Sequence, residues 1–374
     1  LERLAEALAE LGVENDFALW QEKRRAPVRT NTIMAAPSLY PRITPGAPIV
    51  YEADKKSDNR SAFGNALQSL AEANNTQSGN AKIVGVCCDL EGSVKMGGFR
   101  KHSPGAYIEA GIQEHHAAGM SGALSRENLV TFFSTFGAFA VSEVYNQNRL
   151  SDFNHANLKV VATHVGLDVG EDGPTHQCID YLGLMKNYFR FSVFMPADPN
   201  QTDRIIRHVA VTPGNHFVGM GRSITPVLTD EEGKVFFGAD YVFTPGRADW
   251  LRRGTDLTIV TYGALVPAVI QAWDLLRQEG ISAGVLNMAS LLPLDEESLA
   301  AAANIGPLLT VEDHHVASGL GASAAAALMD RGIAARMKRL GVSHYASSGK
   351  PAELYAEQGL DPKSIAAAAK SLLK

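Results

Sequence analysis

The chain has 374 residues, enough for two or three domains, and its 45% hydrophobic and 20% charged residues are typical of a packed globular protein. It carries 34 basic and 40 acidic residues, so its net charge of −6 gives no support to nucleic-acid binding. Three cysteines without a CxxC pair are too few for a disulfide framework and indicate a reducing, cytoplasmic compartment.

The first elements along the chain are a helix and an extended segment. Leucines recur at helical spacing over residues 1–11 and Gly12 supplies a stop, so we expect a helix there. Acidic residues among these leucines exclude a signal peptide. Residues 25–48 are rich in proline and in small or basic residues, which predicts an extended connector. The uncharged stretch 128–142 is too short and too polar to cross a membrane.

Beyond residue 52, short apolar runs alternate with helical stretches, which is typical of parallel βαβ units. The predicted strands are 82–88, 129–133, 158–163, 257–262, 281–286 and 308–312. The predicted helices are 114–124, 266–278 and 323–329. A polar patch at 230–234 marks a break. We expect an α/β protein with an N-terminal helix and connector over 1–51, followed by two consecutive domains, 52–235 and 236–374. Each domain should be a mostly parallel sheet flanked by helices.

Two motifs suggest cofactors but have simpler explanations. Residues 319–324 fit the pattern GxGxxA of dinucleotide-binding folds. Six residues separate them from the preceding strand, however, and the nearest acid, Asp330, comes too soon. We expect a close-packed helix start instead. The histidine pairs 115–116 and 314–315 do not predict zinc, because adjacent side chains diverge on a helix or strand.

The most informative segment is residues 163–177, which follow a predicted strand. They contain two histidines and three carboxylates among turn-forming residues. Loops at the carboxyl ends of strands form the ligand crevice of open α/β sheets, so this loop is a candidate site. Taken alone, it could equally be a solvated turn with incidental histidines.

Other segments add to this loop. Residues 107–122 contain a glutamate that opens a helix of small residues, and residues 133–139 read Phe-Ser-Thr-Phe-Gly-Ala-Phe. With the run Gly-Glu-Asp-Gly-Pro-Thr-His-Gln at 170–177, these segments resemble the pyrimidine-binding domain of transketolase, a thiamine-diphosphate enzyme of the pentose phosphate pathway. The resemblance continues at 195–199, 218–222, 310–314 and 348–354, and it covers residues 52–374.

This resemblance implies a cofactor site. Glu114 is similar to the carboxylate that bonds N1′ of the aminopyrimidine and assists removal of the proton at C2 of the thiazolium. A glutamate favoured by the helix dipole is the alternative explanation. Phe136 and Phe139 match the aromatic residues that pack on the pyrimidine, although lone phenylalanines are more often plain core.

The resemblance also implies a substrate site for sugar phosphates. His164 and His176 are similar to residues that bond the donor's oxygens or shuttle protons, and Asp172 to one that recognises a hydroxyl at C2. Three further residues fall where the family holds the sugar phosphate: Arg60, Ser93 and Arg222. An arginine suits this task because its fork binds phosphate oxygens in a bidentate manner. The surroundings of Ser93 match the family less well than the others do.

One part of the family's pattern is missing. Thiamine enzymes hold the diphosphate through Mg²⁺ on a Gly-Asp-Gly motif with a later asparagine. The nearest match, residues 171–173 with Asn200, lacks the first glycine. We therefore expect no metal ligands on this chain and a diphosphate-binding domain either upstream or on a partner subunit. The chain begins with Leu rather than Met, which fits either processing or a piece of a longer polypeptide. A homodimer is expected by analogy with the family.

The resemblance implies a transferase that moves a two-carbon ketol unit from a ketose phosphate to an aldose phosphate with thiamine diphosphate. Alone, the chain should be inactive. Two other thiamine enzymes stay open as alternatives: a 1-deoxyxylulose-5-phosphate synthase and the β subunit of a 2-oxoacid dehydrogenase. The first lacks a counterpart of His164, and the second lacks the histidine-rich loop. A non-catalytic assembly subunit would not need Glu114, His164, Asp172 and Arg222 together.

Overall fold

A computed structural model describes residues 2–13, 18, 22, 40–54, 57–76 and 80–374. The chain divides into two units, Leu1–Leu39 and Tyr40–Lys374. In the first unit the predicted N-terminal helix is confirmed as α1 (Glu2–Glu10), which is followed by a turn where Gly12 has a φ of +66°. Residues 25–39 of the predicted connector lie outside the described residues.

The first sheet of the second unit has seven strands in the order β12-β6-β7-β5-β4-β2-β3. All neighbouring strands are parallel except β12 and β6. The bounds are β2 (Ile83–Cys87), β3 (Tyr107–Glu109), β4 (Val130–Phe136), β5 (Leu158–Thr163), β6 (Phe191–Phe194), β7 (Asn215–Gly219) and β12 (Ser290–Leu292). Every residue of β2, β4 and β5 is buried. Burial on both faces explains why these strands are rich in apolar residues and do not alternate between apolar and polar positions.

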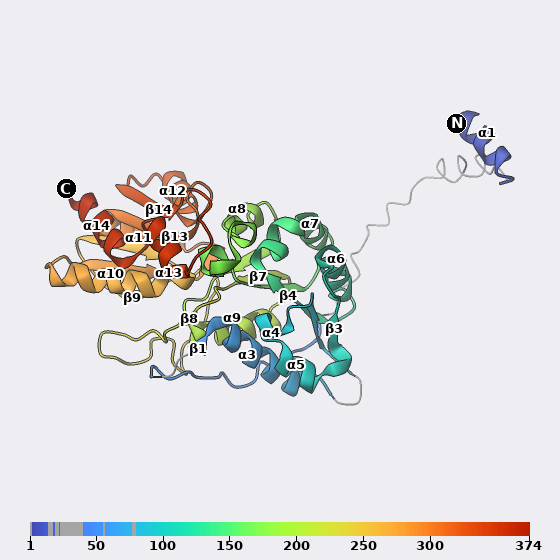
Figure 1. Ribbon diagram of the computed structural model, residues 1–374, viewed down its shortest axis with the longest axis horizontal. Coiled ribbons are helices and arrows are strands. Elements are labelled where there is room, and N and C mark those ends of the chain that lie inside the picture. Colours follow the sequence, from blue (N-terminus) through green and yellow to red (C-terminus); the bar gives the residue numbers. More distant parts are fainter. Residues whose placement is uncertain (1, 14–17, 19–21, 23–39, 55–56, 77–79) are drawn as a thin grey trace. The chain divides into compact units, whose positions relative to one another are not determined.

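Helices cover both faces of this sheet (Figure 1). On one face lie α3 (Asn59–Asn74), α5 (Gly97–His102) and α9 (Pro199–Val211). On the other lie α6 (Glu114–Leu124), α7 (Tyr145–Phe153) and α8 (Tyr181–Met185). A separate hydrophobic cluster fills each side. Three short elements complete this region: β1 (Ser57–Asp58) and β8 (Ile224–Thr225), which pair antiparallel, and the one-turn helix α4 (Glu91–Val94).

The second sheet has five strands in the order β14-β13-β10-β11-β9, with β9 antiparallel to β11 and the other pairs parallel. Its strands are β9 (Asp249–Arg252), β10 (Leu257–Thr261), β11 (Ala283–Asn287), β13 (Leu308–His315) and β14 (Met337–Val342). Its helices are α10 (Val266–Gln278), α11 (Glu296–Ile305), α12 (Leu320–Asp330), α13 (Pro351–Glu357) and α14 (Pro362–Leu373). Two consecutive α/β domains with mostly parallel sheets are therefore confirmed.

The two sheets are joined more closely than the sequence predicts. Strand β12 belongs to the second predicted domain, yet it pairs with β6 at the edge of the first sheet. The hydrophobic cluster around α6, α7 and α8 also continues into α11 and α12. The domain boundaries at residues 51 and 235 stay a prediction, since the packing is shared across the second of them.

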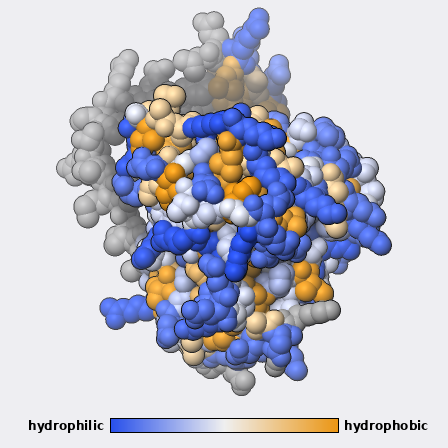
Figure 2. Space-filling model, turned by 90° about the vertical axis from the view of Figure 1, so that its left-hand side faces the viewer, coloured by the Kyte–Doolittle hydropathy of each residue, from blue (hydrophilic) through white to orange (hydrophobic). Residues whose placement is uncertain are grey.

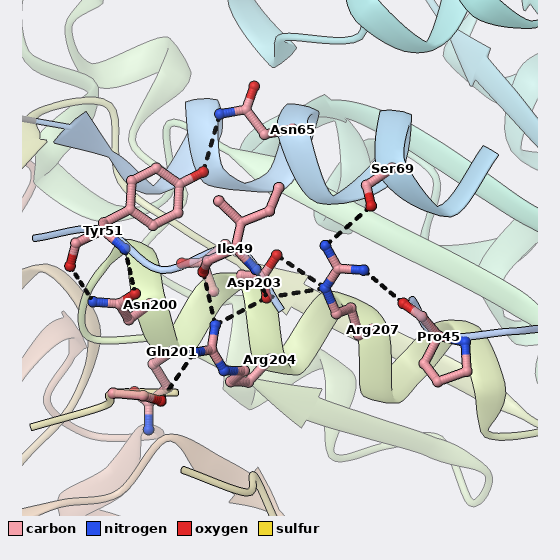
Figure 3. A network of polar contacts seen from close by, with 12 residues as sticks. Pro45, Ile49, Tyr51, Asn65, Ser69, Asn200, Gln201, Asp203, Arg204 and Arg207 are labelled. Atoms are coloured by element: carbon pink, nitrogen blue, oxygen red, sulfur yellow. Dashed lines mark hydrogen bonds and ion pairs between the residues drawn. The ribbon is translucent and has the colours of Figure 1, made fainter. Parts of the chain in front are cut away.

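The described end of the predicted connector is bound to α9 and α3 by a buried polar network (Figure 3). The Asp203 carboxylate, fully buried, lies 3.0 Å from both Arg204 Nη1 and Arg207 Nε. Arg204 Nη1 donates to the carbonyl of Ile49 at 2.8 Å, and Arg207 Nη1 donates to that of Pro45 at 2.6 Å. The backbone of this segment thus finds its partners in side chains of α9 rather than in a sheet.

On the face that carries α10 and α14 in Figure 1, hydrophilic side chains predominate, and hydrophobic residues lie in small scattered groups (Figure 2). Such scattering is ordinary for a protein surface. Among the described residues, no helix combines the length and the apolar character that a membrane crossing requires.

Candidate functional site

The predicted loop begins where β5 ends, at the carboxyl edge of the parallel sheet. His164 follows the last residue of β5 and has a φ of +57°, a backbone conformation that few non-glycine residues adopt. The loop is closed at its base, because Val165 bridges to Cys178 and the Gly166 amide donates to the Cys178 carbonyl at 2.9 Å. Two 3₁₀ turns fill it: η3 (Gly166–Asp172) and η4 (Pro174–His176).

The structure brings two predicted phenylalanines and two predicted histidines together. Phe136 ends β4, the strand beside β5, and its ring lies nearly parallel to that of Phe139, with centroids 6.1 Å apart at 8°. The His164 ring lies 3.8 Å from Phe136. His176 approaches Phe139 edge-on at 5.3 Å. The end of β4, the start of the π-helix η2 (Phe139–Glu143) and the loop after β5 therefore form an aromatic–histidine cluster, the four residues Phe136, Phe139, His164 and His176.

Glu114 is the first residue of α6, as predicted, and α6 packs on β4. It is only 6% exposed, and no hydrogen bond or ion pair joins its carboxylate to another described side chain. The helix N-terminus favours its negative charge. Burial and the Glu114 charge both raise the pKa of the Cys88 thiol, to about 12. A buried carboxylate without a partner in the described protein can bond a ligand.

His164 lies in an environment that keeps its imidazole neutral. Burial lowers its pKa to about 3, and the nearby charges of Arg60, Arg222, His176 and Lys95 act in the same direction. Its Nδ1 lies 2.9 Å from the hydroxyl oxygen of the preceding threonine. A neutral ring held at one nitrogen can use the other nitrogen as a hydrogen-bond donor or acceptor for a ligand.

Arg60 and Ser93 are adjacent, but they meet through the Ser93 backbone. Arg60 is the second residue of α3 and donates from Nη1 to the Ser93 carbonyl at 3.2 Å, while its Nε lies 3.5 Å from Asp58 Oδ1. The Arg60 side chain is 15% exposed. The Ser93 hydroxyl makes no hydrogen bond with any described group, so it is open to a ligand.

Arg222 has a second role beside the one predicted for it. Its Nη1 donates to the Val169 carbonyl at 2.9 Å and to Glu171 Oε2 at 3.0 Å, which ties η3 to the end of β7. The Arg222 side chain is still 38% exposed. Asp172, the last residue of η3, is exposed, and its side chain makes no hydrogen bond with the described protein.

Sequence reasoning missed a third cation beside His164. Lys95 is exposed and ends α4 in the left-handed conformation, with a φ of +63°. Its backbone packs against Gly64 of α3, where an added Cβ would lie 2.2 Å from the Lys95 carbonyl oxygen. Gly64 stands one helical turn after Arg60, so the same face of α3 positions both cations. In the sequence, Gly64, four residues after Arg60, was the one sign that another backbone segment packs closely on this face of α3.

Two buried carboxylates near the loop were also missed. Asp168 in η3 accepts hydrogen bonds from the Ser223 amide at 2.8 Å and from the Ser223 hydroxyl at 2.5 Å. Asp313 in β13 accepts one from the Leu167 amide at 2.8 Å. Burial raises the pKa of both carboxyls, that of Asp313 to about 7. Asp313 comes from a distant part of the chain, and no sequence signal connects it to this loop.

The sequence motifs that we did not interpret as cofactor sites have structural roles. The carboxylate of Glu312 accepts the Leu320 and Gly321 amides at the start of α12, at 2.5 and 2.9 Å. A Cβ on Gly319 would lie 1.8 Å from Glu312 Oε2. The predicted close-packed helix start is therefore confirmed. Asn200 is used to bond the backbone of Tyr51 in both directions, at 2.8 Å each way. The described residues contain no cluster of histidine, cysteine, aspartate or glutamate that could hold a metal ion.

Comparisons with known proteins match both parts of the second unit. Residues 55–226 match the family model of the transketolase pyrimidine binding domain, and residues 246–365 match that of the transketolase C-terminal domain. A putative transketolase C-terminal section from Methanocaldococcus jannaschii is 33% identical over 286 residues, which cover 76% of this chain and 88% of that protein. One of the subunits of an apulose-4-phosphate transketolase from Phocaeicola vulgatus is 30% identical, over 84% of this chain and 97% of that protein.

The fold is matched as well. A solved structure described as a split gene transketolase, inactive beta4 tetramer, superposes with a TM-score of 0.75 and 33% identity, over 84% of this chain and 98% of that one. The two family models match the two regions of the sequence that form most of the two sheets. The chain belongs to the transketolase family.

Proposed function

We propose that this chain supplies the pyrimidine side of a thiamine-diphosphate site. With a diphosphate-binding section it would transfer a two-carbon ketol unit from a ketose phosphate to an aldose phosphate. Membership of the transketolase family supports the reaction class. We further propose the cytoplasm and the pentose phosphate pathway as its setting, as the sequence predicts.

The aromatic–histidine cluster beside the start of α6 is the observation that carries this proposal. Phe136 and Phe139 offer two nearly parallel rings, which suit a planar heterocycle. The Glu114 carboxylate is buried and free of partners within the described protein, so it suits a ring nitrogen that needs a proton. These residues fit a pyrimidine, and they would hold it by stacking and by one hydrogen bond.

The residues of this chain would then act on protons and on the substrate. When bound, thiamine diphosphate supplies the carbon nucleophile and stabilises the charge that develops on it. Glu114 would hold a proton at N1′. His164, neutral at working pH, would bond a substrate oxygen through its free nitrogen, and half-buried His176 would exchange a proton with the substrate. Asp172 would bond the C2 hydroxyl.

The cations around His164 suit the other end of the substrate. Arg60, Arg222 and Lys95 all lie close enough to His164 to affect its pKa. The Ser93 hydroxyl completes the group, and charge-assisted bonds from guanidinium groups are the strong contacts to phosphate. We infer that these residues bind the phosphate of the sugar. Ligands for Mg²⁺ are expected on the diphosphate-binding section, because the described residues here offer no metal cluster.

The alternatives fit less well. A 1-deoxyxylulose-5-phosphate synthase or a 2-oxoacid dehydrogenase β subunit would not use His164 and His176 as a pair, yet both contact the phenylalanines. A non-catalytic assembly subunit would not need a buried carboxylate without a partner. The relative described as an inactive β4 tetramer supports self-association of this chain without turnover. We propose a homodimer as the minimal assembly.

Replacement of Glu114 by Gln tests the proposal. The chain is mixed with a diphosphate-binding section of a split transketolase, and ketol transfer is measured with a ketose phosphate donor and an aldose phosphate acceptor. Glu114→Gln should lower kcat by about 10² to 10⁴-fold, because an amide cannot share a proton with N1′. The control is Glu127→Gln, at an exposed glutamate after α6. Activity of Glu114→Gln equal to that of the control would refute the assignment.

A further inference from the structure

The loop that carries His164, Asp172 and His176 is held by both domains. Its base is bonded to its own sheet, since the Val165 amide donates to the Met220 carbonyl at 3.1 Å. The remainder contacts two parts of the C-terminal domain: the carboxyl end of β13 and the turn at residues 346–351. Just after the loop, the His315 amide also donates to the Ile179 carbonyl at 2.6 Å. These contacts connect the C-terminal domain to the loop.

Asp313 makes the contact nearest to His164. Its Oδ1 accepts the Leu167 amide at 2.8 Å, and its Oδ2 accepts the Tyr355 hydroxyl at 2.7 Å. Gly166 packs on the same carboxylate, since an added Cβ would lie 2.1 Å from Oδ2. Gly166 has a φ of +77°, so both its conformation and its lack of a side chain serve this approach. The carboxylate therefore fixes the backbone two and three residues after His164.

The far end of the loop is bound separately. The Gln177 side chain exchanges two hydrogen bonds with the Ala346 backbone, each 3.0 Å long. The Ser348 hydroxyl donates to the Glu171 carbonyl at 2.6 Å. Gly173 lies against Ser348, where an added Cβ would make ordinary contact at 3.4 Å. This second set of contacts borders Asp172 and His176, whereas Asp313 borders His164.

We propose that Asp313 of the C-terminal domain is a positioning residue for His164. Asp313 holds the Gly166–Leu167 backbone in place, and thereby holds the His164 ring against Phe136 with one nitrogen open. A function for the C-terminal domain follows: it sets the conformation of the loop in the other domain. This inference deepens the proposed function and depends on it for its kinetic consequences alone.

The neighbouring Glu312 provides a matched control. It is as deeply buried as Asp313 and lies on the same strand, but it accepts the first amides of α12 instead of a loop amide. Alanine at either position removes a buried carboxylate and lowers stability. Loss of Asp313 alone should disturb His164.

The direct test is a histidine NMR titration on the full chain, which needs no activity. The His164 signal is the one absent from His164→Gln. In the wild type it should stay in its neutral form between pH 5 and 8, as its pKa of about 3 implies, and it should show the ring-current shift of Phe136. Asp313→Ala should reduce that shift and move the His164 titration toward the ordinary pKa of 6.5. Asp313→Asn keeps an acceptor for Leu167 and should resemble the wild type.

Several outcomes would overturn the proposal. One is a His164 signal in Asp313→Ala that matches the wild type, and another is a change in Glu312→Ala as large as in Asp313→Ala. If Asp313→Ala does not fold, Gly166→Ala replaces it, because its Cβ would push the carboxylate away. Gly170→Ala is then the control, since Gly170 has a similar φ of +71° but meets Pro351. Equal His164 signals in these two variants would also refute the role.

Kinetics of the complemented enzyme give the second readout. Asp313→Ala should lower kcat by about 100-fold, as expected when a catalytic group is displaced by about 1 Å, with KM for the sugar phosphates within about twofold of the wild type. Asp313→Asn should restore most of kcat. An equal rise in KM with unchanged kcat would contradict positioning of His164. Absence of ketol transfer in the wild type would count against the proposed function, and the NMR result would still decide the role of Asp313.

Discussion

His164 illustrates how single residues in this site are adjusted by their surroundings. Three cationic side chains approach it from α3, the turn after α4 and the end of β7, and the ring itself is 4% exposed. Burial and positive charge act in the same direction, so the imidazole stays neutral. The positive charge near His164 is therefore carried by the two arginines and the lysine, which are the groups that would bind a phosphate. His176 is more exposed and meets Phe139 edge-on.

Replacement of Arg222 should have two separate kinetic effects, one from the lost phosphate contact and one from the lost contact with the loop. Arg222→Ala should raise KM for phosphorylated donors by a free energy of about 1.5 to 3 kcal/mol, which is the contribution of a hydrogen bond to a charged group. It should also lower kcat modestly with every donor, because Arg222 holds the Val169 carbonyl of the loop. Steady-state kinetics with a ketose phosphate and with a ketose that lacks phosphate would measure both effects.

Glu171→Gln is the matched control for Arg222. It weakens the ion pair, whose atoms lie 3.0 Å apart, but leaves the guanidinium in place. Both partners are more than a third exposed, so this pair contributes little to stability. KM for the phosphorylated donor should therefore stay near the wild-type value or fall. An equal loss with both donors in Arg222→Ala would indicate that Arg222 serves the fold rather than the phosphate.

The start of α12 is bonded to a buried carboxyl group, that of Glu312. Its first amides bond the Glu312 carboxylate, so the helix dipole and two hydrogen bonds favour the charged form, while burial disfavours it. Burial dominates and raises the pKa of Glu312 to about 8 from an ordinary 4.5. The folded state then binds a proton over a pH range in which the unfolded state does not.

This carboxyl should make stability depend on pH. Because its folded pKa is raised, its contribution is fully present below pH 4.5 and is lost as the pH rises through about 8. The slope is about 1.4 kcal/mol per pH unit for one proton. In urea unfolding, the wild type should lose stability relative to Glu312→Gln as the pH rises from 5 to 8, because only the wild type carries this titrating carboxyl. A difference that is constant with pH would contradict this prediction.

The polar network on α9 holds the segment before α3 in place (Figure 3). Arg207→Ala would remove the donor to the Pro45 carbonyl and one of the two arginine partners of buried Asp203. Breaking a buried ion pair costs about 3 to 5 kcal/mol. We expect that loss in denaturant unfolding, together with faster proteolysis at residues 40–51. Arg149→Ala, at an exposed arginine of α7, is the control and should change neither.

At the scale of the whole molecule, the sequence predicted what is local and missed what is distant. Strand β2 is a continuous apolar run, and its burial on both faces gives that pattern directly. Strands β5 and β10 are mostly apolar and include the buried polar residues Lys159 and Thr258. The pairing of β12 with β6 could not be predicted, since three residues carry too short a pattern. The contact of Asp313 with Leu167 joins residues 146 positions apart, and no spacing rule reaches that far. The loop itself was recognised because its residues are contiguous.

Without a diphosphate-binding section, this chain should bind thiamine diphosphate weakly or not at all. In the proposed function, Glu114, Phe136 and Phe139 would hold the pyrimidine, and the described residues contain no cluster that could hold Mg²⁺. Each hydrogen bond to a charged group contributes about 1.5 to 3 kcal/mol, so the diphosphate contacts should supply most of the affinity. Calorimetry on the purified chain with Mg²⁺ and thiamine diphosphate should therefore show weak binding or none.

A diphosphate-binding section should restore both tight binding and ketol transfer. The comparison needs three samples: the chain, the section and their mixture, each titrated with the same cofactor. In the mixture, Phe139→Ala should weaken binding, because it removes one of the two parallel rings, whereas Phe153→Ala, at a phenylalanine that is 78% exposed, should not. The chain alone should still fold and self-associate, since both sheets and their helices are complete within the described residues. Micromolar binding together with turnover by the chain alone would refute the divided site.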